Sequence, residues 1–515
     1  MLRELSIILL YMVIAECATI EYSLKRQAIL EAEKRHATGG NAFLTAKEAL
    51  ADEILINLKQ QLSVDATNNP DTYAPAMHFF RAKPLIEASA VFKILKAMPK
   101  GSVLHLHNVA AVSSEWIVKN LTYRPEAKLC EMNGSYVFTT SISKLCPESA
   151  IRDIQKMRAQ NGTTEQFDLW LESMINLRLR GPELMTADLN QIWNEFERMF
   201  TMVRDLISYK PIFEAFHTRL LEEFYEDNVF YIELRMSLSK IYDASNRVYG
   251  EMEVAKIVQQ LVDTFCSANP DFIGVKVIFS KHRGIDTGTA QDLLNSFVKL
   301  NAELPNLVIG FDLVGQEDIN QPLTIFLDEL RKFEATTPYF FHAGETNGYG
   351  SNADLNLIDA VLLNSRRIGH GYSLYKHPVL WKAVKSKGIA LEVCPLSNQV
   401  LRLVTDLRNH PAVFFVSESI PIVIASDDPG FWDSKAVSFD YYYAFMAMAP
   451  TSAGIGFLKQ IVWDSVRYSS LTAKERQRFS EILQTRWDLF VDDLSSGRLT
   501  VPNCMSFKHS AASAE

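Results

Sequence analysis

The chain has 515 residues, 48% of them apolar and 22% charged, which is an ordinary composition for a globular protein. Its formal net charge of −9 argues against nucleic acid as the main partner, because neutralising phosphates requires a basic surface. We therefore expect the chain to bind a small molecule. The length fits two or three average domains, or a single α/β barrel with insertions.

The first 18 residues are typical of a secretory signal peptide. Arg3 supplies a positive charge, and residues 5–15 form an apolar run that is too short to cross a bilayer. Small residues then offer a cleavage site after Cys17 or Ala18. The alternative interpretation is a buried first helix. No other stretch is long enough to span a membrane, so we expect a secreted, extracellular protein.

Residues 19–97 are predicted to form a helical arm. Thr45 and Glu48 make a capping box, in which each side chain bonds the backbone of the other residue. The helix that follows carries apolar residues at helical spacing: Leu50, Ile54, Leu55, Leu58 and Leu62. Gly39 and Gly40 separate it from an earlier helix. The arm can pack on its own core or on a second copy of the chain, and the sequence does not decide between them.

Residues 111–185 are irregular and polar, and we interpret them as an insertion lobe. Three Asn-x-Ser/Thr sequons fall within this stretch: Asn120, Asn133 and Asn161. Clustered acceptor sites in a secreted chain indicate a solvent-facing, glycosylated segment. Cys130 and Cys146 lie in the same stretch, so a disulfide that closes a small loop is expected outside the cell. The remaining cysteines after the signal are predicted to be isolated: Cys266, Cys394 and Cys504.

Strand-like and helix-like patterns alternate from residue 186 onward. With the first strand they give eight buried segments: 103–109, 229–236, 273–280, 307–315, 339–345, 366–372, 389–398 and 421–429. Apolar strands that alternate with helices indicate a parallel sheet covered by helices, and eight units close a (β/α)8 TIM barrel. A doubly wound open sheet is the alternative, disfavoured because no Gly-x-Gly-x-x-Gly follows the first strand. We assign residues 98–110 and 186–500 to the barrel and residues 501–515 to a C-terminal tail.

Polar side chains gather at the C-terminal ends of these strands, the rim at which barrel active sites lie. Residues 103–109 alternate like a strand, which puts His105 and His107 on one face. The stretch 338–346 delivers His342 and, three residues later, Glu345. The other residues at or just past strand ends are Asn108, His282, Gly315, His370, Asp427 and Asp428. This concentration predicts one site at the rim.

Four of the rim residues form a set of metal ligands with three nitrogens and one oxygen: His105, His107, His342 and Asp427. Such a set suits a catalytic Zn²⁺ that keeps one position open for water. Lewis acidity brings the pKa of that water towards neutrality and gives a hydroxide nucleophile. Glu345 and His370 are then the candidate proton carriers. Asp428 is a candidate to accept a hydrogen bond from the substrate.

The motifs that carry these residues resemble the adenosine deaminase family, specifically its secreted branch, the adenosine deaminase-related growth factors (adenosine deaminase 2-like). The matching motifs are HLH (105–107), FHAGET (341–346), RIGHGY (367–372), CPLSNQVL (394–401) and SDDPG (426–430). The signal peptide, the arm, the sequon-bearing insertion and YEDNVFYIELR (225–235) also fit that branch. The resemblance covers essentially the whole chain after the signal.

The resemblance implies a role for each residue of the site. Zinc is expected on the four ligands named above, and an activated water attacks C6 of the purine. His370 is expected to act as the base or the electrostatic guide for that water, and Glu345 to donate a proton to N1. Asp428 is expected to bond N7 and the Gly315 amide to meet N3. Further nucleoside contacts are implied for Asn108, Trp193 and His282.

Two positions depart from the pattern of close relatives. Asn108 stands where they carry Asp directly after His-x-His, which removes a charge-assisted contact to a ribose hydroxyl. Gly348 stands where they often carry Trp, which removes stacking area. Both changes bear on substrate affinity rather than on the chemistry.

The leading hypothesis is a secreted zinc adenosine deaminase that acts on adenosine or 2′-deoxyadenosine. The rival, from another class, is a growth-factor or receptor-binding protein that keeps the fold but turns over substrate weakly. An amidohydrolase for another amine-bearing purine is a third option, with AMP disfavoured because no basic cluster marks a phosphate site. The resemblance also implies a homodimer formed through residues 19–97, and a cell-surface receptor as a partner.

Overall fold

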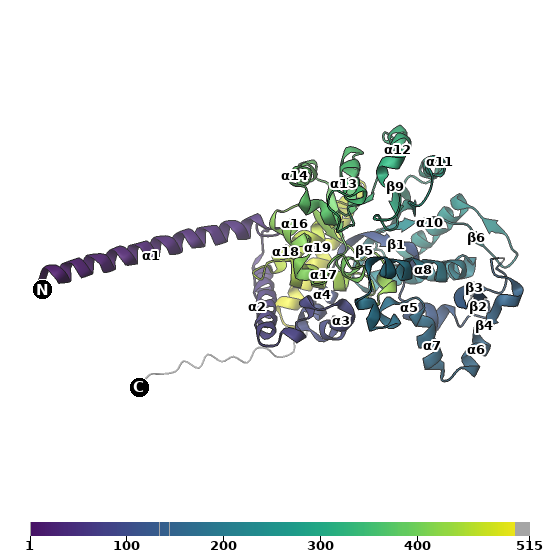
Figure 1. Ribbon diagram of the computed structural model, residues 1–515, viewed down its shortest axis with the longest axis horizontal. Helices are drawn as coiled ribbons and strands as arrows, with labels where there is room; N and C mark the ends of the chain where they lie inside the picture. Colours follow the sequence, from purple (N-terminus) through teal and green to yellow (C-terminus); the bar gives the residue numbers. More distant parts are fainter. Residues whose placement is uncertain (1, 133, 144, 500–515) are drawn as a thin grey trace.

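The computed structural model describes residues 2–132, 134–143 and 145–499. Side chains are described from residue 19 onward, except that of residue 70. Asn133 and the predicted tail at 501–515 therefore lie outside the described residues. The arm comes first, followed by a barrel from which a lobe projects (Figure 1). None of the helices in the described ranges combines the length and apolar character needed to cross a bilayer.

Eight parallel strands close into a barrel, as the sequence predicted. They are β1 (Gly101–His107), β5 (Val229–Met236), β8 (Gly274–His282), β9 (Val308–Val314), β10 (His342–Ala343), β11 (Arg367–His370), β12 (Ala390–Val393) and β13 (Ile422–Ile424). The strands pair in the orders β1-β5-β8-β9 and β10-β11-β12-β13. Two parallel bridges join these halves: Phe311 with Tyr339, and Leu106 with Asp427. The sheet is therefore continuous around the barrel.

Helices surround the strands. They are α9 (Lys210–Glu226), α10 (Glu251–Ala268), α11 (Thr287–Glu303), α12 (Leu327–Phe333), α13 (Asn352–Leu362), α14 (Pro378–Lys387), α15 (Pro395–Val400), α16 (Ala412–Ser417), α17 (Ser438–Tyr443), α18 (Ile455–Arg467) and α19 (Ala473–Ser495). Each turns an apolar face inward; α11, for example, buries Ala290, Leu294, Phe297 and Leu300. A short hairpin, β6 (Ile241–Tyr242) and β7 (Val248–Tyr249), follows β5.

Four predicted strands are several residues shorter than expected: 339–345, 366–372, 389–398 and 421–429. Two of them have a clear local cause. The segment predicted over 339–345 has only β10 as regular strand, because Pro338 offers no N–H and the amides of Gly344 and Glu345 donate to the Glu317 side chain. The segment predicted over 389–398 ends as a strand at Val393, because α15 begins with a proline at its first position. In both cases the lost residues form the loops that hold the site.

The N-terminal region divides into a projecting helix and a docked part. Helix α1 (Leu2–His36) is continuous and extends away from the barrel (Figure 1), and its described residues, 19–36, are almost all exposed. The remaining helices, α2 (Ala46–Asn68), α3 (Phe79–Ala88) and α4 (Ala90–Ala97), pack on the chain's own barrel. The predicted capping box of Thr45 and Glu48 is present at the start of α2.

Buried polar contacts fix α2 to the barrel. The Glu48 carboxylate accepts the indole N–H of Trp487 at 2.8 Å and pairs with Lys459. Further along the helix, the Lys59 ammonium donates to three backbone carbonyls at the end of the 444–448 turn: Phe445, Ala449 and Pro450. Burial lowers the pKa of Lys59 to about 7. The docked arm is thus part of the barrel's core.

The insertion is more regular than its sequence indicated. It contains α5 (Ser114–Trp116), an antiparallel sheet of β2 (Ala127–Met132), β3 (Ser135–Thr140) and β4 (Ile151–Asp153), and helices α6 (Ile154–Gln160) and α7 (Thr164–Ser173). Cys130 and Cys146 form a disulfide, the pair that the sequence favoured. The sequon residues Asn120 and Asn161 are exposed. Strand β3 packs on α8 (Leu189–Ile207), where Thr139 bonds Asp205, and α8 leads back to the barrel.

Candidate active site

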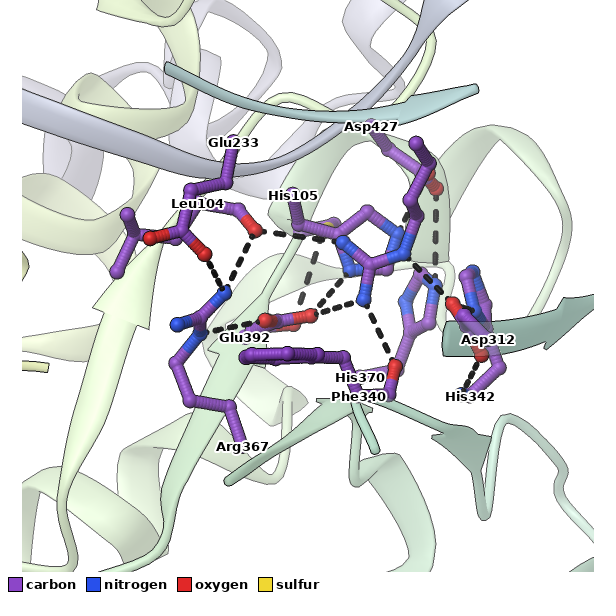
Figure 2. A network of polar contacts seen from close by, with 12 residues as sticks. Leu104, His105, Glu233, Asp312, Phe340, His342, Arg367, His370, Glu392 and Asp427 are labelled. Carbon is purple, nitrogen blue, oxygen red and sulfur yellow. Dashed lines mark hydrogen bonds and ion pairs between the residues drawn. The ribbon is translucent and has the colours of Figure 1, made fainter. Parts of the chain in front are cut away.

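Four candidate ligands meet at the C-terminal mouth of the barrel. Figure 2 shows three of them: His105, His342 and Asp427. Strand β1 alternates its side chains, so His105 and His107 point to the same side. The backbone of Asp427 bridges to this strand, donating to the His105 carbonyl and accepting from the His107 N–H. His342 opens β10 and pairs in register with Gly369 on β11. Residues up to 322 positions apart therefore share one centre.

The spacing of these ligand atoms fits a tetrahedral metal ion. The Nε2 atoms of His105 and His107 lie 3.3 Å apart, and those of His107 and His342 also lie 3.3 Å apart. Asp427 Oδ1 lies 3.1 Å from the Nε2 atoms of both β1 histidines. Ligands held about 2.0–2.1 Å from a tetrahedral Zn²⁺ lie about 3.3 Å from one another. The buried Oδ1 of Asp427 makes no hydrogen bond in the described chain, as expected for an atom reserved for a cation.

Two carboxylates orient the histidine ligands from behind. His105 Nδ1 lies 2.8 Å from Glu392, and His342 Nδ1 lies 2.7 Å from Asp312. A carboxylate accepts, so each ring carries its hydrogen on Nδ1 and turns the lone pair of Nε2 to the centre. Burial lowers the pKa of His342 to about 3, which favours the neutral, ligating form.

Two buried arginines tie these carboxylates together (Figure 2). Arg235 donates to Asp312 at 2.7 Å and to Glu392 at 2.6 Å. Arg367 donates to the other oxygen of Glu392 and to Glu233. Although burial opposes ionisation, the two arginines hold the pKa of Glu392 well below its ordinary value. The layer is rigid and fully ionised at its centre.

The formal charges of this layer also favour a divalent cation. Arg235 and Arg367 contribute +2, and three carboxylates contribute −3: Glu233, Asp312 and Glu392. Asp427 adds −1, so the sum over these groups is +2 − 3 − 1 = −2. A bound M²⁺ cancels this charge in a region from which water is excluded. The donor set and the charge therefore both favour a divalent cation.

Two residues of the site hold unusual backbone conformations. His370 has φ +57° and Asp427 has φ +60°, in the left-handed region that non-glycine residues rarely adopt. Gly371, directly after His370, has φ +58°. Strain of this kind persists where the surrounding contacts over-determine it, as they commonly do at functional sites.

Two acidic side chains next to the centre favour their neutral forms. Burial, together with the Asp427 and Glu317 carboxylates, raises the pKa of Glu345 well above its ordinary value. Burial and the adjacent Asp427 raise the pKa of Asp428 in the same way. One oxygen of each, Glu345 Oε1 and Asp428 Oδ1, makes no hydrogen bond within the described residues. Each can therefore offer an O–H donor to a ligand.

The loop that carries Glu345 is held by Glu317. This buried carboxylate accepts the backbone N–H groups of Gly344 at 3.2 Å and Glu345 at 2.8 Å. It also accepts the Asn356 amide at 2.6 Å. Gly344 has φ +74°, and a Cβ there would meet Leu357 at 2.7 Å, so glycine is required at this turn.

A cavity of about 780 Å³ opens above the centre. It includes every residue that the sequence analysis assigned to the substrate: Asn108, Trp193, His282, Gly315 and Asp428. His107, His342, Glu345, His370 and Asp427 form its floor. Helix α8 supplies aromatic surface through Trp193, Phe196 and Phe200. Gly348 lies outside this lining, so the aromatic surface of the cavity comes from α8 rather than from the loop after Glu345.

Gly315 and His282 form one corner of the cavity. Gly315 has φ +101°, and a Cβ there would lie 2.4 Å from the His282 ring. His282 Nδ1 accepts the Gly284 N–H at 3.0 Å, so its hydrogen is on Nε2, which faces Glu197 at 3.4 Å. The absence of a side chain at position 315 is thus what lets the imidazole reach the cavity wall.

Asn108 contacts a buried histidine that the sequence analysis did not single out. His217 has its Nδ1 2.7 Å from the Phe213 carbonyl and its Nε2 2.7 Å from the Asn108 side chain. Burial lowers the pKa of His217 to about 4, so the ring is neutral at pH 7 and has one N–H. The Phe213 carbonyl can only accept a hydrogen bond, so the hydrogen of the ring is on Nδ1 and Nε2 is an acceptor. The Asn108 amide is therefore flipped, so that its N–H rather than its oxygen faces Nε2. Asn108 then presents its oxygen to the cavity.

The polar layer beneath the ligands is the main part of the site that the sequence analysis missed. Its carboxylates and arginines lie on strands that were recognised as buried: Glu233 and Arg235 on β5, Asp312 on β9, Arg367 on β11 and Glu392 on β12. A charged residue within an otherwise apolar strand was the available signal, because a buried charge requires a partner. Other cavity residues that were missed are Asn194, Glu197, Arg198, Thr201, Arg204, Ser237, Ser239, Ser280, Lys281 and Leu401.

Comparisons with known proteins show which families and proteins the chain is similar to. Residues 181–486 match the family described as adenosine deaminase, and residues 7–95 match the adenosine/AMP deaminase N-terminal family. Adenosine deaminase 2 of Homo sapiens is 39% identical over 480 residues, covering 92% of this chain and 93% of the human one. An adenosine deaminase of Lutzomyia longipalpis is 36% identical over 480 residues, covering 92% and 94%.

Solved structures show the same fold at low identity. The Arabidopsis ADAL protein complexed with IMP superposes with a TM-score of 0.55 at 16% identity, covering 77% of this chain and 99% of that one. An amidohydrolase from Burkhoderia ambifaria with bound Zn gives a TM-score of 0.52 at 18% identity, covering 79% and 95%. At these identities the likeness concerns the fold alone.

Proposed function

The chain belongs to the adenosine deaminase family, and from this premise we propose that it is a secreted, zinc-dependent adenosine deaminase. Its reaction is the hydrolysis of adenosine, and of 2′-deoxyadenosine, at C6 of the purine, which gives the inosine product and ammonia. The cavity is large enough for a nucleoside and reaches the candidate metal ligands at its floor.

One observation carries the proposal: a tetrahedral ligand set lies beside two buried carboxyl groups that favour the neutral form. His105, His107, His342 and Asp427 would hold the zinc ion. When bound, zinc lowers the pKa of a coordinated water towards neutrality and so supplies a nucleophile at pH 7. The residues of the chain do the remaining work.

The carboxyl groups match the acceptors of an adenine ring. Purine N1 and N7 are both hydrogen-bond acceptors, so each needs a donor. Glu345, kept protonated by burial and by its acidic neighbours, gives its proton to N1, which makes C6 electrophilic. Asp428, also kept protonated, donates to N7 and fixes the orientation of the ring. The Gly315 amide remains the proposed partner of N3, and Trp193 the apolar wall.

The test is ammonia release from adenosine by the purified, zinc-replete protein, measured beside its Glu345→Ala variant. We expect turnover by the wild type and its loss in the variant, with zinc content unchanged because Glu345 is not a ligand. A zinc-replete wild type without turnover on adenosine or 2′-deoxyadenosine would refute the proposal. Adenine and AMP, assayed alongside, decide whether another purine is preferred.

Secretion forms part of the proposal and is supported by three features of the chain. The first 18 residues have the composition of a signal peptide. Cys130 and Cys146 form a disulfide, which persists in oxidising compartments. The sequon residues Asn120 and Asn161 are exposed and so accessible to glycosylation, with Asn133 the third candidate. Mass spectrometry of protein from the medium of expressing cells gives both the N-terminus and the glycans.

A homodimer is the proposed assembly, with α1 as its contact. The described part of α1 exposes large apolar side chains that no other part of the described chain covers: Ile20, Tyr22, Leu24, Ile29 and Leu30. Burying them against a second copy removes apolar surface from water. Deleting residues 19–36 is expected to give a monomer by light scattering, whereas a dimer that survives the deletion places the contact elsewhere.

The rival hypothesis of a weakly active binding protein predicts a damaged site. The ligand set, the orienting carboxylates and both neutral carboxyl groups are instead all present. A growth-factor role carried by the active enzyme, with a cell-surface receptor, stays a proposal. The effect of the Glu345→Ala protein on responsive cells separates signalling from turnover.

A further inference from the structure

A chain of three hydrogen bonds leads from a backbone amide to His370, the residue that faces the reacting centre. The Ala412 N–H donates to His410 Nδ1 at 2.9 Å. His410 Nε2 lies 2.9 Å from the Asn398 side-chain oxygen, and the Asn398 side-chain nitrogen lies 3.2 Å from His370 Nδ1. All three side chains are at most 2% exposed. No solvent molecule can therefore substitute for a missing partner.

The backbone amide gives this chain a direction. An amide N–H only donates, so Nδ1 of His410 is an acceptor without a hydrogen. Burial lowers the pKa of His410 to about 3, so the ring is neutral and its single hydrogen is on Nε2. That hydrogen points at the Asn398 oxygen, and the Asn398 amide must then turn its N–H to His370. His370 Nδ1 is therefore an acceptor as well.

The opposite direction is not available to these residues. Reversing the Asn398 amide would turn its N–H against the Nε2–H of His410 and its oxygen towards His370. Moving the hydrogen of His410 to Nδ1 would then set two donors face to face at Ala412. Each unpaired buried polar group costs about 1–3 kcal/mol. The ring of Tyr372, edge-on to His410 at 5.2 Å, also restricts reorientation of the imidazole.

The consequence appears at the other end of the His370 ring. With Nδ1 occupied as an acceptor, neutral His370 carries its hydrogen on Nε2. Nε2 lies 3.6 Å from Glu345 Oε1 and 3.7 Å from Asp427 Oδ2, so it points into the space between the proton donor and a metal ligand. This space lies beside the ligand set, where the proposed reaction places the attacking oxygen.

We propose that Asn398 and His410 are positioning residues that lock His370 as a hydrogen-bond donor to the attacking oxygen. This inference rests on the proposed function, because it assigns His370 one of the two roles that a deaminase could give it. His370 holds and polarises that oxygen and does not serve as the base that removes its proton. Asn398 and His410 act through His370 and touch neither substrate nor metal.

The decisive measurement is the protonation pattern of the His370 ring in the zinc-loaded wild type. Protein labelled with ¹⁵N at histidine is examined by NMR at neutral pH, and the His370 signals are assigned by their loss in His370→Gln. We expect Nε2 to carry the hydrogen and Nδ1 to be bare. The reverse pattern overturns the proposal, whatever the activity of the protein. The proposed function stands or falls separately, on ammonia release.

Variants test whether the lock matters for turnover. Asn398→Leu keeps the size of the side chain but neither donates nor accepts, so the hydrogen of His370 is expected to distribute over both nitrogens. We expect kcat to fall by about 10²-fold, the scale of losing one preorganised hydrogen-bond donor, with little change in KM. An unchanged kcat in a folded Asn398→Leu protein overturns the functional part of the proposal.

Two further variants separate this role from a purely structural one. His410→Gln keeps an N–H that can donate to Asn398, so it should retain kcat and the His370 pattern. Gln399→Leu is the matched control: Gln399 is the next residue of α15, equally buried, but bonds Phe79, Met77 and Thr405 away from the centre. The Gln399→Leu substitution should lower thermal stability and leave both kcat and the His370 protonation pattern unchanged. A loss of the His370 pattern in Gln399→Leu would assign the effect to packing.

Discussion

Two asparagine–histidine pairs flank the reacting centre, and the same residue types act in opposite directions. In the pair of Asn398 and His410, Nδ1 of the histidine accepts a backbone N–H, so its Nε2 donates. In the pair of Asn108 and His217, Nδ1 faces a backbone carbonyl, so its Nε2 accepts. One asparagine therefore presents its N–H to His370, and the other is left with its oxygen for the cavity.

The backbone group next to each histidine therefore determines whether the asparagine presents its N–H or its oxygen. Both histidines are buried and neutral at pH 7, because burial lowers the pKa of His217 to about 4 and that of His410 to about 3. A neutral ring has one donor and one acceptor, so fixing one nitrogen fixes the other. The pair of Asn398 and His410 therefore acts on the chemistry, and the pair of Asn108 and His217 acts on substrate binding.

Removal of the metal is expected to have the largest effect, because both pairs serve a centre that depends on it. Without the cation, the layer around the ligands keeps its formal charge of −2 and the attacking water keeps its ordinary pKa. Dialysis against a chelator should abolish ammonia release and lower the Tm, and added zinc should restore both. Activity that persists at undetectable metal content would contradict the proposal that turnover depends on a metal ion at this site. The Asn398→Leu and Asn108→Leu proteins should retain their zinc, since neither residue is a ligand.

Identical substitutions at the two asparagines provide the sharpest test of the comparison. Asn398→Leu is expected to lower kcat, whereas Asn108→Leu is expected to raise KM for adenosine by about tenfold, the loss of one hydrogen bond of about 1.4 kcal/mol, and to change kcat little. Steady-state kinetics on both variants, made in parallel, give the result. If both change the same constant, the proposed division of roles is wrong.

Asn108→Asp tests the same contact, and the expected change in KM has the opposite sign. A carboxylate cannot donate to Nε2, so His217 must take up a proton and pair with it, while the second oxygen accepts a ribose hydroxyl with a charge-assisted bond. KM should therefore fall below the wild-type value. A rise in KM would show that the neutral asparagine is the better partner in this cavity.

Much of the centre was predictable because it depends on residue type and strand ends alone. His105 and His107 share a strand face by the period of two, and Asp427 follows the last barrel strand. Parallel strands in a closed barrel bring their C-terminal ends together without any further information. The eight strands and the four ligands follow from that rule. Strand lengths did not follow from it, because the Glu317 carboxylate accepts the amides of Gly344 and Glu345 that would have continued β10.

The two pairs were not predictable for a physical reason. Asn398 lies in α15 and His410 lies just before α16, so their contact depends on the path of the chain between the two helices. His217 sits on a helix face where a buried histidine is ordinarily just part of the core. Nothing in the sequence tells which nitrogen of a histidine meets a backbone group. The visible signal was limited to CPLSNQVL, a motif whose asparagine had no assigned role.

Acid stability tests the premise that both histidines are neutral. Each has a folded pKa below the value of 6.5 for an unperturbed histidine, so the unfolded chain binds a proton that the folded chain refuses. Stability is then complete above about pH 6.5 and falls as the pH drops towards the folded pKa. At pH 5 the loss is about 2 kcal/mol for each histidine.

His217→Gln removes one of these two contributions. Its free energy of unfolding, measured by denaturant titration, should change less between pH 7 and pH 5 than that of the wild type, by about 2 kcal/mol. The difference between the two proteins cancels any loss of metal in acid, which is common to both. Gln399→Leu, which removes buried hydrogen bonds but no titratable group, is the control and should keep the wild-type slope. A wild-type slope in His217→Gln would mean that folding does not lower the pKa of His217, and the premise that burial keeps this ring neutral would fail.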